Sequence, residues 1–134
     1  MTRLSRTAMA LVGPAHALLR IGVGLLFLQH GLQKLGLLDK AAVPLGSLLG
    51  LAAILEVLGG TLIVLGLWTR LVAFVLVGEM VTAFLLGHFH RGGWPIQNMG
   101  ELPLLYALVF AFLATAGSGP VSIDALRRRS TRRA

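Results

Sequence analysis

Four long apolar windows, separated by short polar segments, dominate this sequence. They cover approximately residues 15–35, 46–67, 71–89 and 102–117. A helix needs about 20 mostly apolar residues to cross the hydrocarbon layer of a bilayer, so each window is a candidate membrane span. The pattern therefore predicts an all-α fold, an integral membrane four-helix bundle.

The segments between the windows carry turn and cap signals. Residues 36–44 contain charged groups and end in a proline, 68–70 form a tight turn, and 90–100 contain Gly and Pro. Asn98, followed three residues later by Glu101, predicts an N-cap that opens the fourth helix. We expect one domain, with a basic N-terminus at 1–14, the transmembrane bundle at 15–117 and a basic, disordered tail at 118–134.

Basic residues gather at one side of this predicted topology. Lys34, Lys40 and Arg91 lie on the far side. The positive-inside rule then places both termini in the cytoplasm. In a soluble protein such charge clusters would suggest nucleic acid, but here we expect anionic headgroups and no nucleic acid partner. The nine arginines on the near side are Arg3, Arg6, Arg20, Arg70, Arg127, Arg128, Arg129, Arg132 and Arg133.

Composition agrees with a lipid environment. The 134 residues are 56% hydrophobic and 13% charged, with a mean hydropathy of +0.84, whereas soluble domains are roughly a quarter charged. Cysteine is absent, which excludes disulfides, thiolate metal centres and thiol redox chemistry by this chain. Any redox role would need a partner, a bound cofactor or a quinone-like lipid.

Two glutamates are the strongest functional candidates, because each lies near the middle of an apolar window. At 1.5 Å per residue, Glu56 and Glu79 lie about 15 and 17 Å below the outer face, so their depths are similar. A carboxylate at that depth costs a few kcal/mol, so it usually faces a partner, a cavity or a substrate. Small residues at 52, 53, 59 and 60 share the face of Glu56, which predicts that Glu56 points into the bundle.

Further polar candidates follow from helical spacing. Arg20, His30 and Lys34 fall within an arc of about 80° on the first helix. Arg20 is expected to hold the charge of the glutamates, either at a site or as a simple buried pair. His30 is either a ligand-binding group or a satisfied core histidine, and Lys34 is expected to be a solvated interface residue. Tyr106 is expected to pack and hydrogen-bond.

The third window ends in a pair of histidines, His88 and His90. If its helix continues far enough, His90 lies almost in line with Glu79 and His88 points the opposite way, so His90 is the favoured candidate. An H-x-H pair at a helix end is weak support for a metal site, so no metal is expected. No phosphate-binding loop, dinucleotide fingerprint or nucleophile elbow occurs in the sequence.

Several segments that carry these polar groups resemble the DoxX family. They include Leu-Arg-Ile-Gly-Val-Gly at 19–24, Gln-His-Gly-Leu-Gln-Lys at 29–34, Glu-Val-Leu-Gly-Gly at 56–60, Gly-Glu-Met at 78–80 and Asn-Met-Gly-Glu at 98–101. The resemblance implies a four-helix protein of the bacterial inner membrane. The family is named for its likeness to the small membrane subunit of an archaeal thiosulfate:quinone oxidoreductase.

The same resemblance implies a link to membrane oxidoreductase systems. Relatives are linked to complexes that handle oxidative or thiol stress, and others accompany genes for the degradation of aromatic compounds. The family motif carries over to Arg20, His30, Glu56, Glu79 and Glu101, without a catalytic role for any of them.

Three hypotheses follow from these observations. The leading one is a small, accessory subunit of a membrane redox system, with a polar pocket for a quinone or another small amphipathic ligand and no covalently bound cofactor. Its partners would be the lipid bilayer, redox-enzyme subunits and further copies of itself. The alternatives are an oligomeric transporter of protons or a small solute, and a non-catalytic membrane anchor or assembly factor.

Overall fold

The computed structural model describes residues 3–131, and this part of the chain is helical, without strands. Arg132 and Arg133, two of the nine near-side arginines, lie outside the described residues, as do the side chains of Arg3 and Arg6. The elements in chain order are α1 (Arg3–Lys34), α2 (Leu48–Leu65), α3 (Thr69–Gly87), the short 3-10 helix η1 (Phe89–Arg91), α4 (Pro95–Asn98), α5 (Glu101–Ala116) and α6 (Ile123–Thr131).

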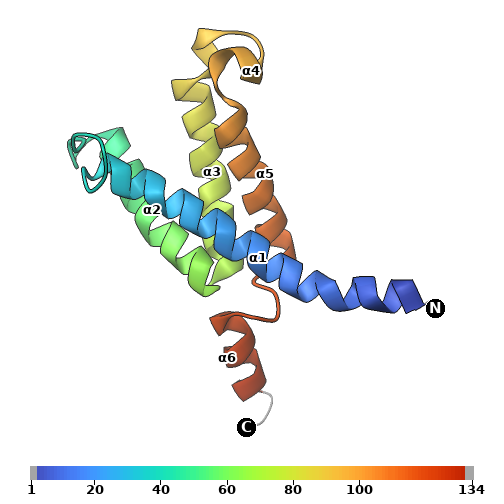
Figure 1. Ribbon diagram of the computed structural model, residues 1–134. Coiled ribbons are helices and arrows are strands. Elements are labelled where there is room, and N and C mark those ends of the chain that lie inside the picture. Colours follow the sequence, from blue (N-terminus) through green and yellow to red (C-terminus); the bar gives the residue numbers. More distant parts are fainter. Residues whose placement is uncertain (1–2, 132–134) are drawn as a thin grey trace.

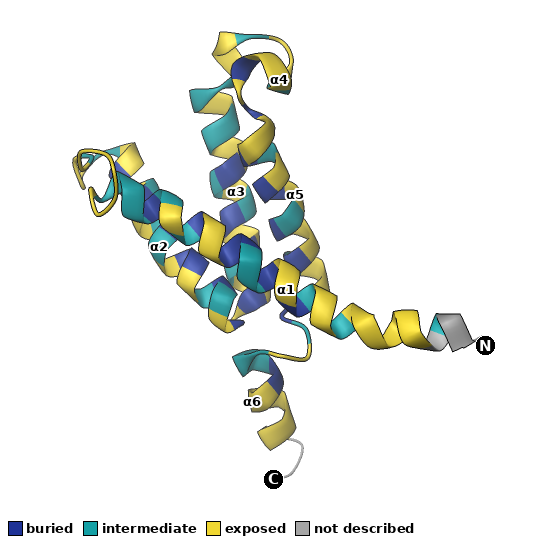
Figure 2. Cartoon of the chain, in the orientation of Figure 1, coloured by how far each residue is buried: buried dark blue, intermediate teal, exposed yellow. Residues whose placement is uncertain are grey.

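Within the described residues, three segments are long and apolar enough to cross a membrane. They are Thr7–Lys34, Leu48–Leu65 and Thr69–Arg91. Helix α5 is apolar as well but has only 16 residues. Large apolar residues on the outer faces of these helices are exposed, and Figure 2 shows exposed positions in yellow along each of the long helices. An exposed apolar surface of this extent suits a lipid environment and not water.

The long helices form two antiparallel pairs, in which α1 packs along α2 and α3 packs along α5. Figure 1 shows the two pairs crossing and then spreading apart. We call the end with the 35–47 loop and the 88–100 segment the loop end. The opposite end, with the 66–68 turn and α6, is called the turn end.

Glycines allow α1 and α2 to approach closely. A Cβ atom on Gly60 would lie 2.9 Å from the backbone N of Leu28, and one on Gly31 would lie 2.8 Å from the carbonyl O of Ala53. These neighbours are backbone atoms, so they cannot move aside. The buried small residues of α2 therefore confirm the predicted packing face, which also carries Glu56.

Aromatic side chains form the core where the two pairs cross. Phe27 of α1 meets Phe110 of α5 edge-on at a ring-centroid distance of 4.8 Å, and Tyr106 at 5.1 Å. Ile63 and Leu76 complete this buried centre from α2 and α3. Aromatic pairs of this geometry are favourable beyond the apolar area that they bury.

Three sequence-based expectations need correction. Helix α1 begins at Arg3, not near residue 15, because no helix-stopping signal follows the polar N-terminus and Pro14 is accommodated inside the helix. Residues 123–131 form α6, so this part of the tail is not disordered. The N-cap of α5 is Gly100, and Asn98 instead ends α4, where its Oδ1 accepts a hydrogen bond from the Gly100 N–H.

Candidate functional site

Glu56 of α2 forms an ion pair with Lys34, the last residue of α1. The distance from Nζ of Lys34 to Oε1 of Glu56 is 2.5 Å. The Glu56 side chain is 3% exposed and that of Lys34 is 27% exposed. Lysine can hold its stem against apolar surface while its ammonium group reaches toward water. Lys34 therefore neutralises a carboxylate inside the bundle from the edge of the loop end.

Glu79 of α3 is the second buried carboxylate. Both its carboxylate oxygens are buried, and neither has a hydrogen-bond partner in the described part of the chain. The charges that act on it most strongly are those of Glu56 and Lys34, so the two glutamates face a common region. A buried charge without partners is expensive. Glu79 must therefore either hold a proton or pair with a group that the described residues do not supply.

His30 and Tyr106 form a ring pair within electrostatic range of the ion pair, His30 of Lys34 and Tyr106 of Glu56. Their ring centroids lie 5.7 Å apart, with the rings perpendicular. One residue or more from each of the long helices thus enters this site. We call it the polar cluster, and its members are His30, Lys34, Glu56, Glu79 and Tyr106.

Arg20 does not belong to the polar cluster. Its guanidinium is 1% exposed and donates to the carbonyl oxygens of Ile63 and Val64 at 2.5 Å and of Val121 at 2.6 Å. The last carbonyls of a helix lack partners within the helix, and a cation there is favourable. The expectation that Arg20 holds the charge of the glutamates is therefore wrong, because it closes the end of α2 and joins it to the segment before α6.

Gly66 makes room for this arrangement at the turn end. It adopts φ of 66°, which favours glycine, and a Cβ atom there would lie 3.0 Å from the Cζ of Arg20. The carbonyl of Gly66 accepts a hydrogen bond from the N–H of Asp124. Arg20, the 66–68 turn and α6 thus form one structural junction.

His90 and Glu101 lie at the loop end, apart from the polar cluster. Both are exposed. Helix α3 ends at Gly87, so the helical projection that aligned His90 with Glu79 does not apply. His88 is the more enclosed histidine, and its Nδ1 lies 2.9 Å from the carbonyl oxygen of Asn98. Residues 3–131 contain no group of three His, Asp or Glu side chains placed to hold a metal ion.

The structure adds Lys34 to the site, although the sequence suggested a solvated interface residue. Lys34 is four residues after His30, so the two share a helix face. That spacing could have indicated Lys34 as a site residue, because a lysine near a helix end can reach several ångströms toward a buried carboxylate. Tyr106 carried no comparable signal, since a single tyrosine in an apolar helix is typical of packing.

Long apolar helices with polar groups turned inward define a helical membrane protein. The DoxX family model matches residues 15–89, more than half of the sequence. The chain therefore belongs to the DoxX family. No solved structure matches it.

Relatives resemble the chain over most of its length. A Haemophilus influenzae protein called "Uncharacterized protein" is 35% identical over 116 residues, covering 81% of this chain and 87% of the relative. An uncharacterized membrane protein of Mycobacterium tuberculosis is 30% identical over 140 residues, with coverages of 90% and 84%. "Putative oxidoreductase CatD" of Bacillus subtilis is 31% identical over 118 residues, with coverages of 80% and 82%.

Proposed function

We propose that this protein is a small accessory subunit of a membrane oxidoreductase system, and that its polar cluster binds a quinone or another small amphipathic molecule. The observation that carries this proposal is the pair of buried, unpartnered oxygens of Glu79, which lie within electrostatic range of Glu56 and Lys34 inside an apolar bundle. The oxidoreductase named among the relatives supports the same class of activity.

The proposal includes a topology. We infer that α5 crosses the membrane despite its 16 residues, because local thinning of the bilayer and interfacial anchors accommodate short helices at modest cost. The protein would then be a multi-pass protein of the bacterial inner membrane, with both termini in the cytoplasm. This agrees with the concentration of arginines near the turn end.

The chemistry of the cluster suits a quinone. A quinone accepts hydrogen bonds at two carbonyl oxygens, and His30, Tyr106 and the ammonium of Lys34 are donors. Its reduction to a quinol takes up two electrons and two protons. Glu56 and Glu79 would pass the protons, as positioned carboxyl groups do in general acid–base catalysis. The electrons would come from a partner oxidoreductase subunit, since this chain has no cysteine thiol to supply them.

Quinone binding by the purified protein tests the proposal. Short-chain benzoquinones and naphthoquinones are titrated into wild-type protein and the variants Glu79→Gln and Glu101→Gln. We expect Glu79→Gln to weaken binding by about tenfold, because the O–H of a protonated Glu79 is a stronger hydrogen-bond donor to a quinone carbonyl than the amide N–H that replaces it. Glu101→Gln is the matched control, since Glu101 is exposed, and it is expected to bind as the wild type does. Absence of binding by the wild type would contradict the proposal.

Membrane assays separate the proposal from its two rivals. Quinone-linked electron transfer in native membranes should fall in a Glu56→Gln/Glu79→Gln strain. If function survived the paired change Lys34→Met/Glu56→Met, the charges would serve only to fix helix register, as an anchor requires. Solute or proton flux in proteoliposomes that depended on both carboxylates would instead indicate a transporter.

A further inference from the structure

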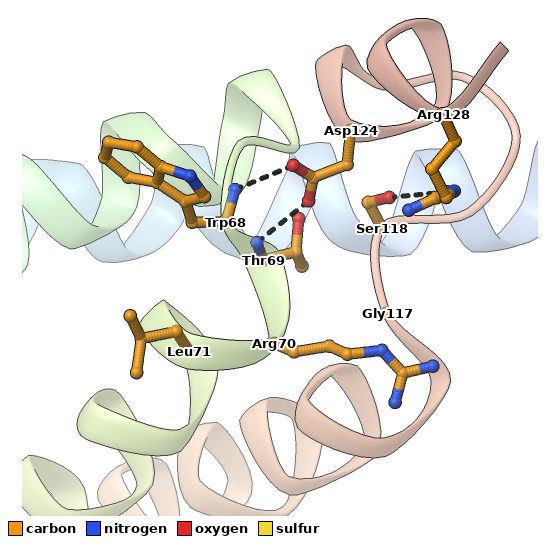
Figure 3. Close-up of a pocket in the computed structure, with 8 residues that line it drawn as sticks. All are labelled: Trp68, Thr69, Arg70, Leu71, Gly117, Ser118, Asp124 and Arg128. Atoms are coloured by element: carbon orange, nitrogen blue, oxygen red, sulfur yellow. Dashed lines mark hydrogen bonds between the residues drawn. The ribbon is translucent and has the colours of Figure 1, made fainter. Parts of the chain in front are cut away.

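A pocket of about 230 Å³ lies at the turn end, remote from the polar cluster. Figure 3 shows that the start of α3, the 117–118 segment and α6 form its walls. Sites for drug-sized ligands and cofactors usually measure about 300–1,000 Å³. This pocket is therefore better matched to a small group such as a phosphate.

Two arginines give the pocket its charge. Arg70 reaches along the start of α3 toward Gly117, and Arg128 reaches from α6 toward Ser118 (Figure 3). The side chain of Arg70 is exposed and makes no hydrogen bond or ion pair in the described part of the chain. Arg128 makes one long hydrogen bond, 3.4 Å from its Nη2 to Oγ of Ser118. Both guanidinium groups therefore keep donors for an anion, and planar donor forks match phosphate oxygens.

Gly117 shapes the floor beneath Arg70. Its φ is 82°, and a Cβ atom there would lie 3.2 Å from Nε of Arg70. A larger residue would therefore be strained in backbone conformation and would press on the guanidinium. The missing side chain leaves Arg70 lying directly over the backbone of the 117–118 segment.

The carboxylate of Asp124 makes no ion pair with either arginine, because both its oxygens accept hydrogen bonds from the backbone, although its charge offsets part of theirs. Its oxygens accept hydrogen bonds from the N–H of Trp68 at 2.9 Å and of Thr69 at 3.0 Å. Partial burial acts to raise the pKa of Asp124, but these hydrogen bonds and the charge of Arg128 outweigh it and hold the pKa below its usual value. Asp124 thus fixes α6 against the start of α3 and preforms the pocket.

Apolar side chains border the pocket on one side. Trp68 and Leu71, which line it, are 57% and 66% exposed. Tryptophan is enriched where a membrane meets water, and basic pockets between membrane helices bind anionic headgroups. We propose that Arg70 and Arg128 bind the phosphate group of an anionic phospholipid, whose acyl chains lie along Trp68 and Leu71.

Lipid binding by the full-length protein tests this site. Purified protein in detergent is titrated with phosphatidylglycerol or with phosphatidylcholine, and the bound lipid is counted by native mass spectrometry. The variant Arg70→Gln/Arg128→Gln is compared with Arg127→Gln/Arg129→Gln, which removes two equal charges from exposed α6 positions outside the pocket. Melting temperatures establish that each variant is folded.

We expect the wild type to retain one phosphatidylglycerol in preference to phosphatidylcholine. Loss of both pocket arginines should weaken that binding by about tenfold to thirtyfold, whereas the control pair should change it by less than about threefold. Arg70→Lys/Arg128→Lys keeps the charge without the planar fork and should give an intermediate loss. Equal losses in the two Gln pairs, or no preference for the anionic lipid, would overturn the site.

A parallel titration with inorganic phosphate identifies the source of the phosphate group. If the pocket serves a lipid, millimolar phosphate should leave phosphatidylglycerol bound. If free phosphate displaced the lipid from the wild type and did not bind to Arg70→Gln/Arg128→Gln, the pocket would be a site for free phosphate, and the lipid proposal would be wrong.

Discussion

At the scale of single residues, the two buried glutamates differ in what supports them. Glu56 has Lys34 at 2.5 Å, whereas both oxygens of Glu79 lack a protein partner. Removing one member of a buried ion pair leaves the other charge buried without a partner, which lowers the stability of the fold. Removing a buried polar group that has no partner instead removes its desolvation penalty, which does not lower the stability of the fold. The stability of the fold should therefore respond to the two residues in opposite ways.

The first prediction compares Glu79→Met with Glu56→Met. Glu79→Met should leave the free energy of unfolding unchanged or raise it by about 1 kcal/mol, because no interaction is lost. Glu56→Met should lower it by about 1–3 kcal/mol, a value reduced because Lys34 can reach water. Unfolding in detergent micelles by titration with sodium dodecyl sulfate measures both. A larger loss for Glu79→Met than for Glu56→Met would mean that Glu79 has a structural partner.

The sequence identified the glutamates but not the cation that balances them. Depth and helical angle placed Arg20, His30 and Lys34 on one side of α1, and both arginine and lysine can extend toward a carboxylate. Which of these cations pairs with Glu56 depends on the position of Arg20 relative to α2, because Arg20 binds the free carbonyls at the C-terminal end of that helix. That information belongs to the pairing of α1 with α2, and no pattern within either segment contains it.

At the scale of elements, glycines differ according to whether a backbone lies opposite them. Gly60 faces the backbone of α1, with a Cβ position 2.9 Å from the N of Leu28. Gly78 of α3 has nothing within 4 Å of its Cβ position. Both lie inside helices, where glycine is unfavourable relative to alanine. The two positions thus form a matched pair for the close contact of α1 and α2.

The second prediction follows from this pair. Gly60→Ala should destabilise the fold by about 1–3 kcal/mol, because two backbones must separate. Gly78→Ala should stabilise it by about 0.5–1 kcal/mol through helix propensity. Thermal unfolding in detergent distinguishes the signs. If both changes stabilised the protein equally, the close approach of α1 and α2 would be wrong.

The third prediction concerns how pH affects the junction of α6 with α3. The pKa of Asp124 is lowered in the folded protein, so its contribution is present above the unfolded value of about 3.9 and is lost as pH falls through the folded pKa. Hydrogen exchange at the amides of Trp68 and Thr69, corrected for intrinsic rates, should therefore lose protection only below about pH 4.

Asp124→Asn supplies the control for that experiment. The amide cannot ionise, so protection at Trp68 and Thr69 should be lower than in the wild type at neutral pH and should not change with pH across the acidic range. A wild-type protection factor that stayed constant down to pH 2 would contradict the assigned role of Asp124.

At the scale of the whole molecule, hydrophobicity along the sequence was sufficient to find the long helices. The ends of α2, α3 and α5 lie within about two residues of the apolar windows, because lipid-facing helices must be apolar on most of their surface. The start of α1 was missed because a helix can continue beyond the apolar layer. Helix α6 was missed because its basic composition resembles a solvated tail, while its attachment depends on Asp124 and the distant 66–68 turn.

The fourth prediction tests the proposed topology. The sequence contains no cysteine, so single-cysteine variants have no background labelling. Leu38→Cys in the first loop should react with a membrane-impermeant maleimide in intact spheroplasts. Ser130→Cys in α6 should react only after the membrane is opened, because both termini are proposed to lie in the cytoplasm. Labelling of Ser130→Cys in sealed spheroplasts would reverse the orientation.

Photolabelling with an azido-quinone tests the central claim most directly, since it reports where the ligand binds. The account predicts labelling of peptides that contain His30, Glu79 or Tyr106, with competition by unlabelled quinone and a strong reduction in Glu79→Gln but not in Glu101→Gln. Labelling confined to the exposed leucines of the outer faces, or unaffected by Glu79→Gln, would show that the polar cluster is not the quinone site.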